Sequence, residues 1–140
     1  MPRLAAPPHA LDLGLSTFDF GHAAWNSMRA VNLYRDGVWL AGPLEVAETF
    51  ADKTKGLLGR DGLPDRRGMV IEYCGSIHTC FMRFAIDVVF LAADGRVRKI
   101  AARLKPWRFA MAPFARRAVE LPAGLAAEIE LAPGQIVELR

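Results

Sequence analysis

The sequence has little cysteine and histidine, and it has no long uninterrupted apolar run. Two cysteines and three histidines among 140 residues are too few for a disulfide-stabilised scaffold. No stretch approaches the roughly 20 consecutive apolar residues of a membrane-spanning helix, so we do not expect an integral membrane protein. A zinc site is not expected at Cys74, His78 and Cys80, because the fourth ligand is missing and the other histidines, His9 and His22, lie near the N-terminus. We therefore expect neither a metal nor a cofactor.

The first residues also lack the features of a secretory signal. They contain one arginine, an early Pro7-Pro8 pair, and the acidic residues Asp12 and Asp19 where an apolar region would be needed. We expect a cytoplasmic protein on this basis. Residues 1–27 are predicted to be an irregular extension, and residues 28–140 a single domain.

A phosphate-binding loop is absent as well. The glycine-rich segment 56–62 lacks the Gly-Lys-Ser/Thr ending, and its glycines follow a predicted helix instead of preceding one. Arg60 in this segment is a ligand-binding candidate, since a guanidinium can hold an acidic group with two hydrogen bonds. A structural salt bridge or a carbonyl cap is the alternative role for Arg60.

The pattern of turns predicts a mainly β protein. Asp36-Gly37 and Asp94-Gly95 each separate two apolar runs, as tight hairpin turns do, and Gly75-Ser76 is a third candidate turn. The alternation of strands and helices that forms a parallel sheet is missing. The expected fold is a small antiparallel barrel-like or sandwich-like domain.

Two helices are expected within this domain. The first spans about 49–58, begins with a Thr49–Asp52 cap and ends at Gly59. A second short helix is expected at about 122–128, followed by a last strand over 135–139.

The segment Ser76–Phe90 is the candidate site, because His78 and Asp87 interrupt an apolar run on either side of a predicted hairpin bend. Ionisable groups in such a run need a partner or a purpose. If the bend near Arg83-Phe84 contains an even number of residues, the two side chains share a face, and Asp87 then orients the imidazole. The alternative is structural, with Asp87 accepting backbone hydrogen bonds and His78 packing its ring.

A basic run gives a further hypothesis. Residues 96–117 contain eight basic residues and no acidic one, interleaved with Trp107, Phe109 and Phe114. Such a segment binds single-stranded nucleic acid in some proteins. The favoured interpretation is an exposed edge strand that its charges protect from pairing.

Several motifs together resemble a known family. GLLGRDGL (56–63), GMVIEY (68–73), SIHTCFM (76–82), AIDVVFLAADGRV (85–97), LKPWR (104–108) and VELPAG (119–124) follow in the order and spacing of the prokaryotic domain-of-unknown-function family DUF192. The resemblance covers about Val31 to Arg140. It implies a compact, mainly β domain with one helix, no established activity, and relatives that often carry export leaders.

The family pattern also has implications for single residues. It matches this sequence at Gly56, Leu57, Arg60, Gly68, Met69, Met82, Asp87, Phe90, Glu120 and Gly124. Many relatives have Trp-Met-Lys-Asn-Thr where this chain has residues 81–85, FMRFA. The resemblance therefore implies that any role of His78 is specific to a branch of the family.

These observations favour a non-catalytic module that binds a small ligand or a protein partner in a groove beside the 76–90 hairpin. The ligand-binding candidates are Arg60, His78, Thr79, Met82, Asp87 and Trp107. The alternative is a hydrolase-like enzyme that uses Asp87 and His78, and nucleic-acid binding through residues 96–117 is the third hypothesis.

Overall fold

The computed structural model describes residues 29–49, 52–53 and 56–140. The predicted extension over 1–27 lies outside these residues. The elements in chain order are β1 (Ala30–Arg35), β2 (Val38–Ala47), β3 (Gly68–Glu72), β4 (Ser76–His78), β5 (Ile86–Leu91), β6 (Val97–Leu104), β7 (Phe109–Met111), β8 (Arg117–Pro122), α2 (Leu125–Glu128) and β9 (Glu138–Leu139).

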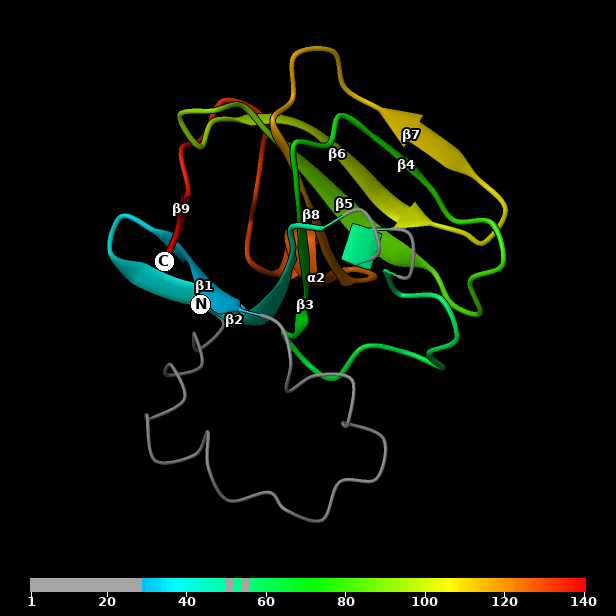
Figure 1. Cartoon of the computed structure of the whole chain (residues 1–140). Helices are drawn as coiled ribbons and strands as arrows, with labels where there is room; N and C mark the ends of the chain where they lie inside the picture. Colours follow the sequence, from blue (N-terminus) through cyan, green and yellow to red (C-terminus); the bar gives the residue numbers. More distant parts are fainter. Residues whose placement is uncertain (1–28, 50–51, 54–55) are drawn as a thin grey trace.

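Most strands belong to one curled, seven-stranded sheet with the order β6-β5-β8-β3-β2-β1-β9. Its pairs are antiparallel except for β2 and β3, which run parallel. β4 and β7 form a separate two-stranded ribbon, which lies to one side of the main sheet (Figure 1). The prediction of a mainly β, barrel-like fold is confirmed, with the sheet curled into a half-barrel.

The two Asp-Gly hairpins are confirmed. Asp36 and Gly37 have φ angles of 51° and 77°, the positive values that a type I′ turn requires at both central residues. Gly95, with φ of 88°, completes the turn between β5 and β6.

Both predicted helices have counterparts. The backbone N–H of Asp52 donates to the hydroxyl of Thr49 at 3.1 Å, and the N–H of Thr49 donates to the Asp52 carboxylate at 3.3 Å, which is the predicted reciprocal cap. Asp52 and Lys53 are helical, whereas residues 56–58, predicted as the end of the helix, form a turn with Gly59 instead. Residues 50–51 and 54–55 of the predicted 49–58 helix lie outside the described residues. The second prediction is confirmed by α2.

The predicted hairpin over Ser76–Phe90 is wrong. β4 pairs with β7, whereas β5 pairs with β6 and β8. All six residues of β5 are buried, and both of its edges are occupied by neighbours in the sheet, so no edge of β5 is left for β4. The turn predicted at Gly75-Ser76 likewise does not join a β3–β4 hairpin, because β3 pairs with β2 and β8.

The main sheet separates two apolar clusters. One contains side chains of β1, β2, β5 and β8 together with α2, and the other contains Met69, Ile71, Val88 and Phe90 beneath the 56–63 turn and the β4–β7 ribbon. Strands that are buried on both faces read as continuous apolar runs. This explains why β5 shows little alternation in the sequence.

β6 is an edge strand of the main sheet. Its residues Arg98, Lys99 and Arg103 are exposed, as the edge-protection interpretation of the basic run predicts. Arg117 at the end of that run forms an ion pair with Glu72 at 2.9 Å. Within the described ranges, no helix is long and apolar enough to cross a membrane.

Candidate functional site

A pocket of about 530 Å³ lies between the turn that follows Lys53, strand β3 and strand β4. This volume is within the range of small-molecule sites. Its lining residues are Lys53, Gly56, Leu57, Leu58, Ile71, Tyr73, Cys74, Ser76, Ile77, His78, Phe81, Met82 and Glu120. The walls are predominantly apolar, and one carboxyl group lies among them.

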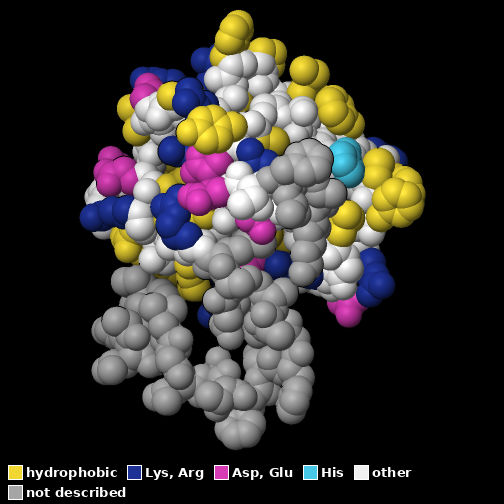
Figure 2. Space-filling view, viewed as in Figure 1, with side chains coloured by type: hydrophobic (Ala, Val, Ile, Leu, Met, Phe, Trp, Pro, Cys, Tyr) yellow, Lys and Arg dark blue, Asp and Glu magenta, His cyan; other side chains and the backbone are white. Residues whose placement is uncertain are grey.

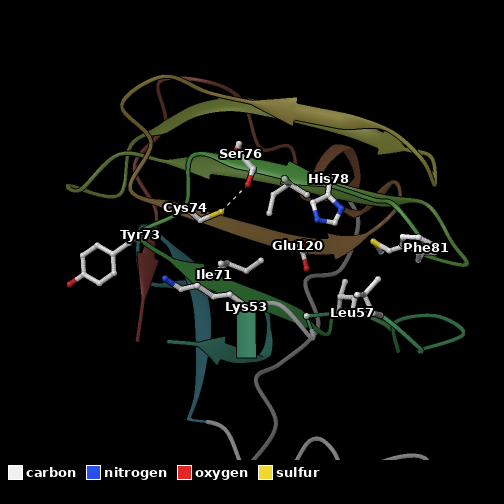
Figure 3. A pocket seen from close by; sticks show the side chains of 13 residues that line it. Lys53, Leu57, Ile71, Tyr73, Cys74, Ser76, His78, Phe81 and Glu120 are labelled. Carbon is white, nitrogen blue, oxygen red and sulfur yellow. Dashed lines mark hydrogen bonds between the residues drawn. The ribbon is translucent and has the colours of Figure 1, made fainter. Parts of the chain in front are cut away.

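That carboxyl group belongs to Glu120 in β8. Figure 3 shows Glu120 at the centre of the pocket, between Ile71 and Leu57 and below His78. The strand residues alternate, so Glu120 faces the pocket while its neighbours Val119 and Leu121 belong to the opposite apolar cluster. The backbone of β3 approaches closely here, because a Cβ on Gly68 would overlap the carbonyl oxygen of Glu120.

The environment of Glu120 is unusual for a carboxylate. The residue is 4% exposed, and its Oε2 atom accepts no hydrogen bond from the described residues. Burial raises its pKa from 4.5 to about 7, although the positive charge of Arg60 acts in the opposite direction. Glu120 therefore changes its charge near neutral pH.

Arg60 lies close to this acid and to a second one. Its guanidinium donates to the Glu45 carboxylate at 2.7 Å, and both side chains are largely buried. Met69 pairs with Glu45 in β2 and with Glu120 in β8, and directly paired residues share a face of the sheet. Glu45 and Glu120 therefore flank Met69 on the pocket side of the sheet.

The mouth of the pocket carries polar and aromatic groups. The Cys74 thiol donates to the carbonyl of Ser76 at 3.0 Å, and burial raises its pKa. Tyr73 is 71% exposed, and cations of Lys53 and Arg116 lie 5.6 and 4.8 Å from the centre of its ring. Both cysteines are free.

Exposed aromatic side chains continue from the mouth along the ribbon. Phe81 in the lining packs against Trp107, with 4.6 Å between ring centroids. Phe109 and Phe114 are also exposed, and Figure 2 shows hydrophobic side chains gathered on this side of the molecule, over β4 and β7. The pocket therefore opens beside an apolar surface.

Four of the six predicted site residues lie in or beside the pocket, and the other two, Thr79 and Asp87, have structural roles. His78 and Met82 line the pocket, Arg60 acts on Glu120 by its charge, and Trp107 contacts a lining residue. Thr79 is instead fully buried. Its hydroxyl donates to the carbonyl of Lys105 at 2.6 Å and accepts from the N–H of Arg108 at 2.8 Å, and it thereby ties the turn after β4 to the start of β7.

Asp87 lies on the other face of the sheet. It pairs with Leu121 and is fully buried. Its carboxylate accepts backbone N–H groups of Arg103 at 2.8 Å, Gly124 at 3.1 Å and Ala126 at 2.8 Å. The expectation that Asp87 and His78 project from one face of a hairpin is wrong, and Asp87 anchors the segment that leads into α2.

Glu120 supplies the carboxyl group of the pocket lining, and it was not among the predicted site residues. It appeared only as a match to the family pattern, although it interrupts the apolar run from Ala118 to Leu121. Like Asp87, it is an ionisable residue in an apolar run, so the same signal could have found it. Within the described residues, no group of three or more His, Cys, Asp or Glu side chains is arranged to hold a metal ion.

Comparison with known proteins gives a family and a fold. Residues 32–139 match the DUF192 family, described as "Uncharacterized ACR". A crystal structure of a protein of unknown function from Novosphingobium aromaticivorans is 27% identical, with a TM-score of 0.69 over 79% of this chain and 84% of that one. No curated protein matches the sequence.

A second similar structure comes from Sinorhizobium meliloti and is described as a "putative transcription regulator". It is 21% identical, with a TM-score of 0.68 over 78% of this chain and 91% of that one. At this identity the similarity concerns the fold alone.

Proposed function

This chain belongs to the DUF192 family, and we propose that it is a non-catalytic module that binds a small, mainly apolar ligand in the pocket beside β4. The observation that carries the proposal is the pocket itself: about 530 Å³ in volume, lined by Leu57, Ile71, Ile77 and Met82, with one buried carboxyl group. Ligand sites generally combine apolar walls with a few polar groups that orient the ligand.

The positions of the ionisable groups support binding over hydrolysis. A general base needs to reach the reacting group from a solvent-open cleft. The carboxylate of Asp87 is enclosed by backbone donors on the opposite face from the pocket. The pairing of His78 with Asp87, on which the hydrolase alternative depended, is therefore not part of this proposal.

A thermal-shift screen of small apolar fragments tests the proposal. A ligand that binds only the folded protein raises the melting temperature. We expect stabilising fragments to shift the NMR signals of Leu57, Ile71, Ile77 and Met82. Fragments that stabilise the protein while shifting only signals outside the lining would contradict the proposed site, as would a screen without any stabilising fragment.

A pair of variants provides the control. Cys74 lines the pocket, and in Figure 3 its sulfur points into it, so Cys74→Trp should fill the space and abolish the fragment-induced shift. Cys80, also a free thiol, is not among the lining residues. Cys80→Trp adds the same side chain elsewhere and should preserve the shift. If Cys74→Trp does not fold, the NMR mapping on the unmodified protein decides.

A further inference from the structure

Two carboxyl groups and one guanidinium lie together on the pocket side of the sheet. Glu45 and Glu120 lie on either side of Met69 on one face of the sheet, and Arg60 contributes one guanidinium beside them. That guanidinium forms its ion pair with Glu45 at 2.7 Å. Of these side chains, Glu120 is the one that lines the pocket, and its carboxylate carries a negative charge there when it is ionised.

Among the described lining residues, the other charged or titratable groups are Lys53, Tyr73, Cys74 and His78. Lys53 has its ammonium 5.6 Å from the centre of the Tyr73 ring, and His78 is an exposed residue of β4. Cys74, the remaining titratable lining residue besides Tyr73, has a raised pKa and is therefore neutral at pH 7. None of the hydrogen bonds formed by the described residues reaches Oε2 of Glu120.

An unsatisfied buried oxygen is costly, and its cost decreases when a donor arrives with the ligand. A cationic donor fits best, because its charge is opposite to that of the ionised Glu120 carboxylate. A carboxylate ligand would instead place a second anion beside Glu120. An alcohol would satisfy the hydrogen bond without compensating the charge.

We propose that the ligand is a small amphiphile whose protonated amino group pairs with Glu120 while its apolar body contacts Leu57, Ile71 and Met82. This inference rests on the proposed binding function and adds the chemical class of the ligand. Glu120 selects amines over alcohols and carboxylic acids of the same chain length, because its position in β8 directs its carboxyl group into the pocket.

The binding should depend on pH in a defined direction. The pKa of Glu120 is about 7, so the carboxyl group is mostly neutral at pH 6 and mostly ionised at pH 8. An alkylammonium group, like a lysine side chain, stays protonated over this range. Amine affinity should therefore rise between pH 6 and pH 8, whereas the affinity for an alcohol should not.

The test uses n-hexylamine, 1-hexanol and hexanoate as probes, titrated into the full chain and followed by NMR. At pH 8 we expect hexylamine to bind about 10-fold or more tightly than hexanol, which is the ratio expected for one charge-assisted hydrogen bond. Hexanoate should bind more weakly than either.

Glu120→Gln should remove the preference for the amine and leave hexanol affinity within about twofold. The matched control Glu138→Gln alters an exposed carboxylate in β9 and should preserve the preference.

The outcomes separate the two proposals. Hexanol or hexanoate binding in the pocket as tightly as hexylamine would overturn the inference and leave the binding function standing. Binding of none of the three probes would overturn the inference, and the fragment screen would then decide the binding function. If Glu120→Gln does not fold, the pH dependence of hexylamine affinity in the unmodified protein decides, since an affinity that is equal at pH 6 and pH 8 contradicts the pairing.

Discussion

Asp87 and Glu120 are buried carboxyl groups on the adjacent strands β5 and β8, and they point to opposite faces of one sheet. Glu120 pairs with Val88, whereas Asp87 pairs with Leu121. The Asp87 carboxylate receives backbone hydrogen bonds from Arg103, Gly124 and Ala126, while an oxygen of Glu120 receives none from the described residues. Asp87 therefore stabilises the fold on one face of the sheet, whereas Glu120 lines the pocket on the other face.

Replacing Asp87 by Asn should mainly reduce stability. The amide has only one acceptor oxygen, and its NH₂ group would meet backbone donors, so we expect a loss of about 2–4 kcal/mol in the free energy of unfolding. Urea denaturation followed by circular dichroism measures this loss. Asp61→Asn is the control, because Asp61 forms an exposed ion pair with Arg83 and should cost less than about 1 kcal/mol. Equal losses in the two variants would contradict the anchoring role of Asp87.

Glu120 should make the stability of the protein depend on pH. Its folded-state pKa of about 7 is above the ordinary value of 4.5, so the folded protein holds this proton more tightly than the unfolded chain. The contribution of Glu120 therefore becomes less favourable as pH rises from 4.5 to 7, by about 3 kcal/mol in total.

Glu120→Gln removes this dependence. The variant should gain stability relative to the unmodified protein between pH 5 and pH 8, by up to about 3 kcal/mol. Denaturant midpoints of both proteins at the two pH values give the difference. A stability difference that is the same at pH 5 and pH 8 would show that the pKa of Glu120 is not raised.

Arg60 should stabilise both acids on the pocket side. Arg60→Met removes the largely buried ion pair with the Glu45 carboxylate, and we expect a loss of about 3–5 kcal/mol. Because the charge of Arg60 lowers the pKa of Glu120, that pKa should rise further in the variant. Carboxyl ¹³C chemical shifts measured against pH test this shift. A pKa of Glu120 that stays the same or falls would contradict the proximity of the two groups.

Thr79 should matter through its hydroxyl group. Thr79→Val keeps the shape of the side chain but leaves the carbonyl of Lys105 and the N–H of Arg108 without this partner, which should cost about 1–3 kcal/mol. Thr79→Ser retains the hydroxyl and should recover most of the loss. Thermal unfolding of the two variants provides the comparison, and a Thr79→Val variant as stable as the unmodified protein would contradict the role of the hydroxyl group.

The local features of the fold were predictable because short-range chemistry determines them. The Asp36-Gly37 turn, the Thr49–Asp52 cap and the short helix near Leu125 each depend on a few neighbouring residues. The pairing of β4 with β7 was not predictable in this way. His78 and Phe109 are directly paired, and the turn chemistry near Arg83 does not indicate a partner that far along the chain.

The site was predicted only in part for the same reason. His78 and Met82 were selected from one segment and do line the pocket, but Glu120 enters it from β8. Its position depends on the strand order of the whole sheet, which places Met69 between Glu120 and Glu45. Strand register determines which face of the sheet a buried acid occupies. A shift of one residue in β5 would move Asp87 to the face on which Glu120 lies.

Binding of an amine beside Glu120 can be observed directly through intermolecular NOEs between n-hexylamine and the full chain at pH 8. We expect NOEs from the alkyl protons to methyl groups of Leu57, Ile71, Ile77 and Met82, together with a lower pKa of Glu120 in the complex than in the free protein. NOEs confined to residues outside the pocket lining, or a Glu120 pKa that the bound amine does not lower, would contradict this binding mode.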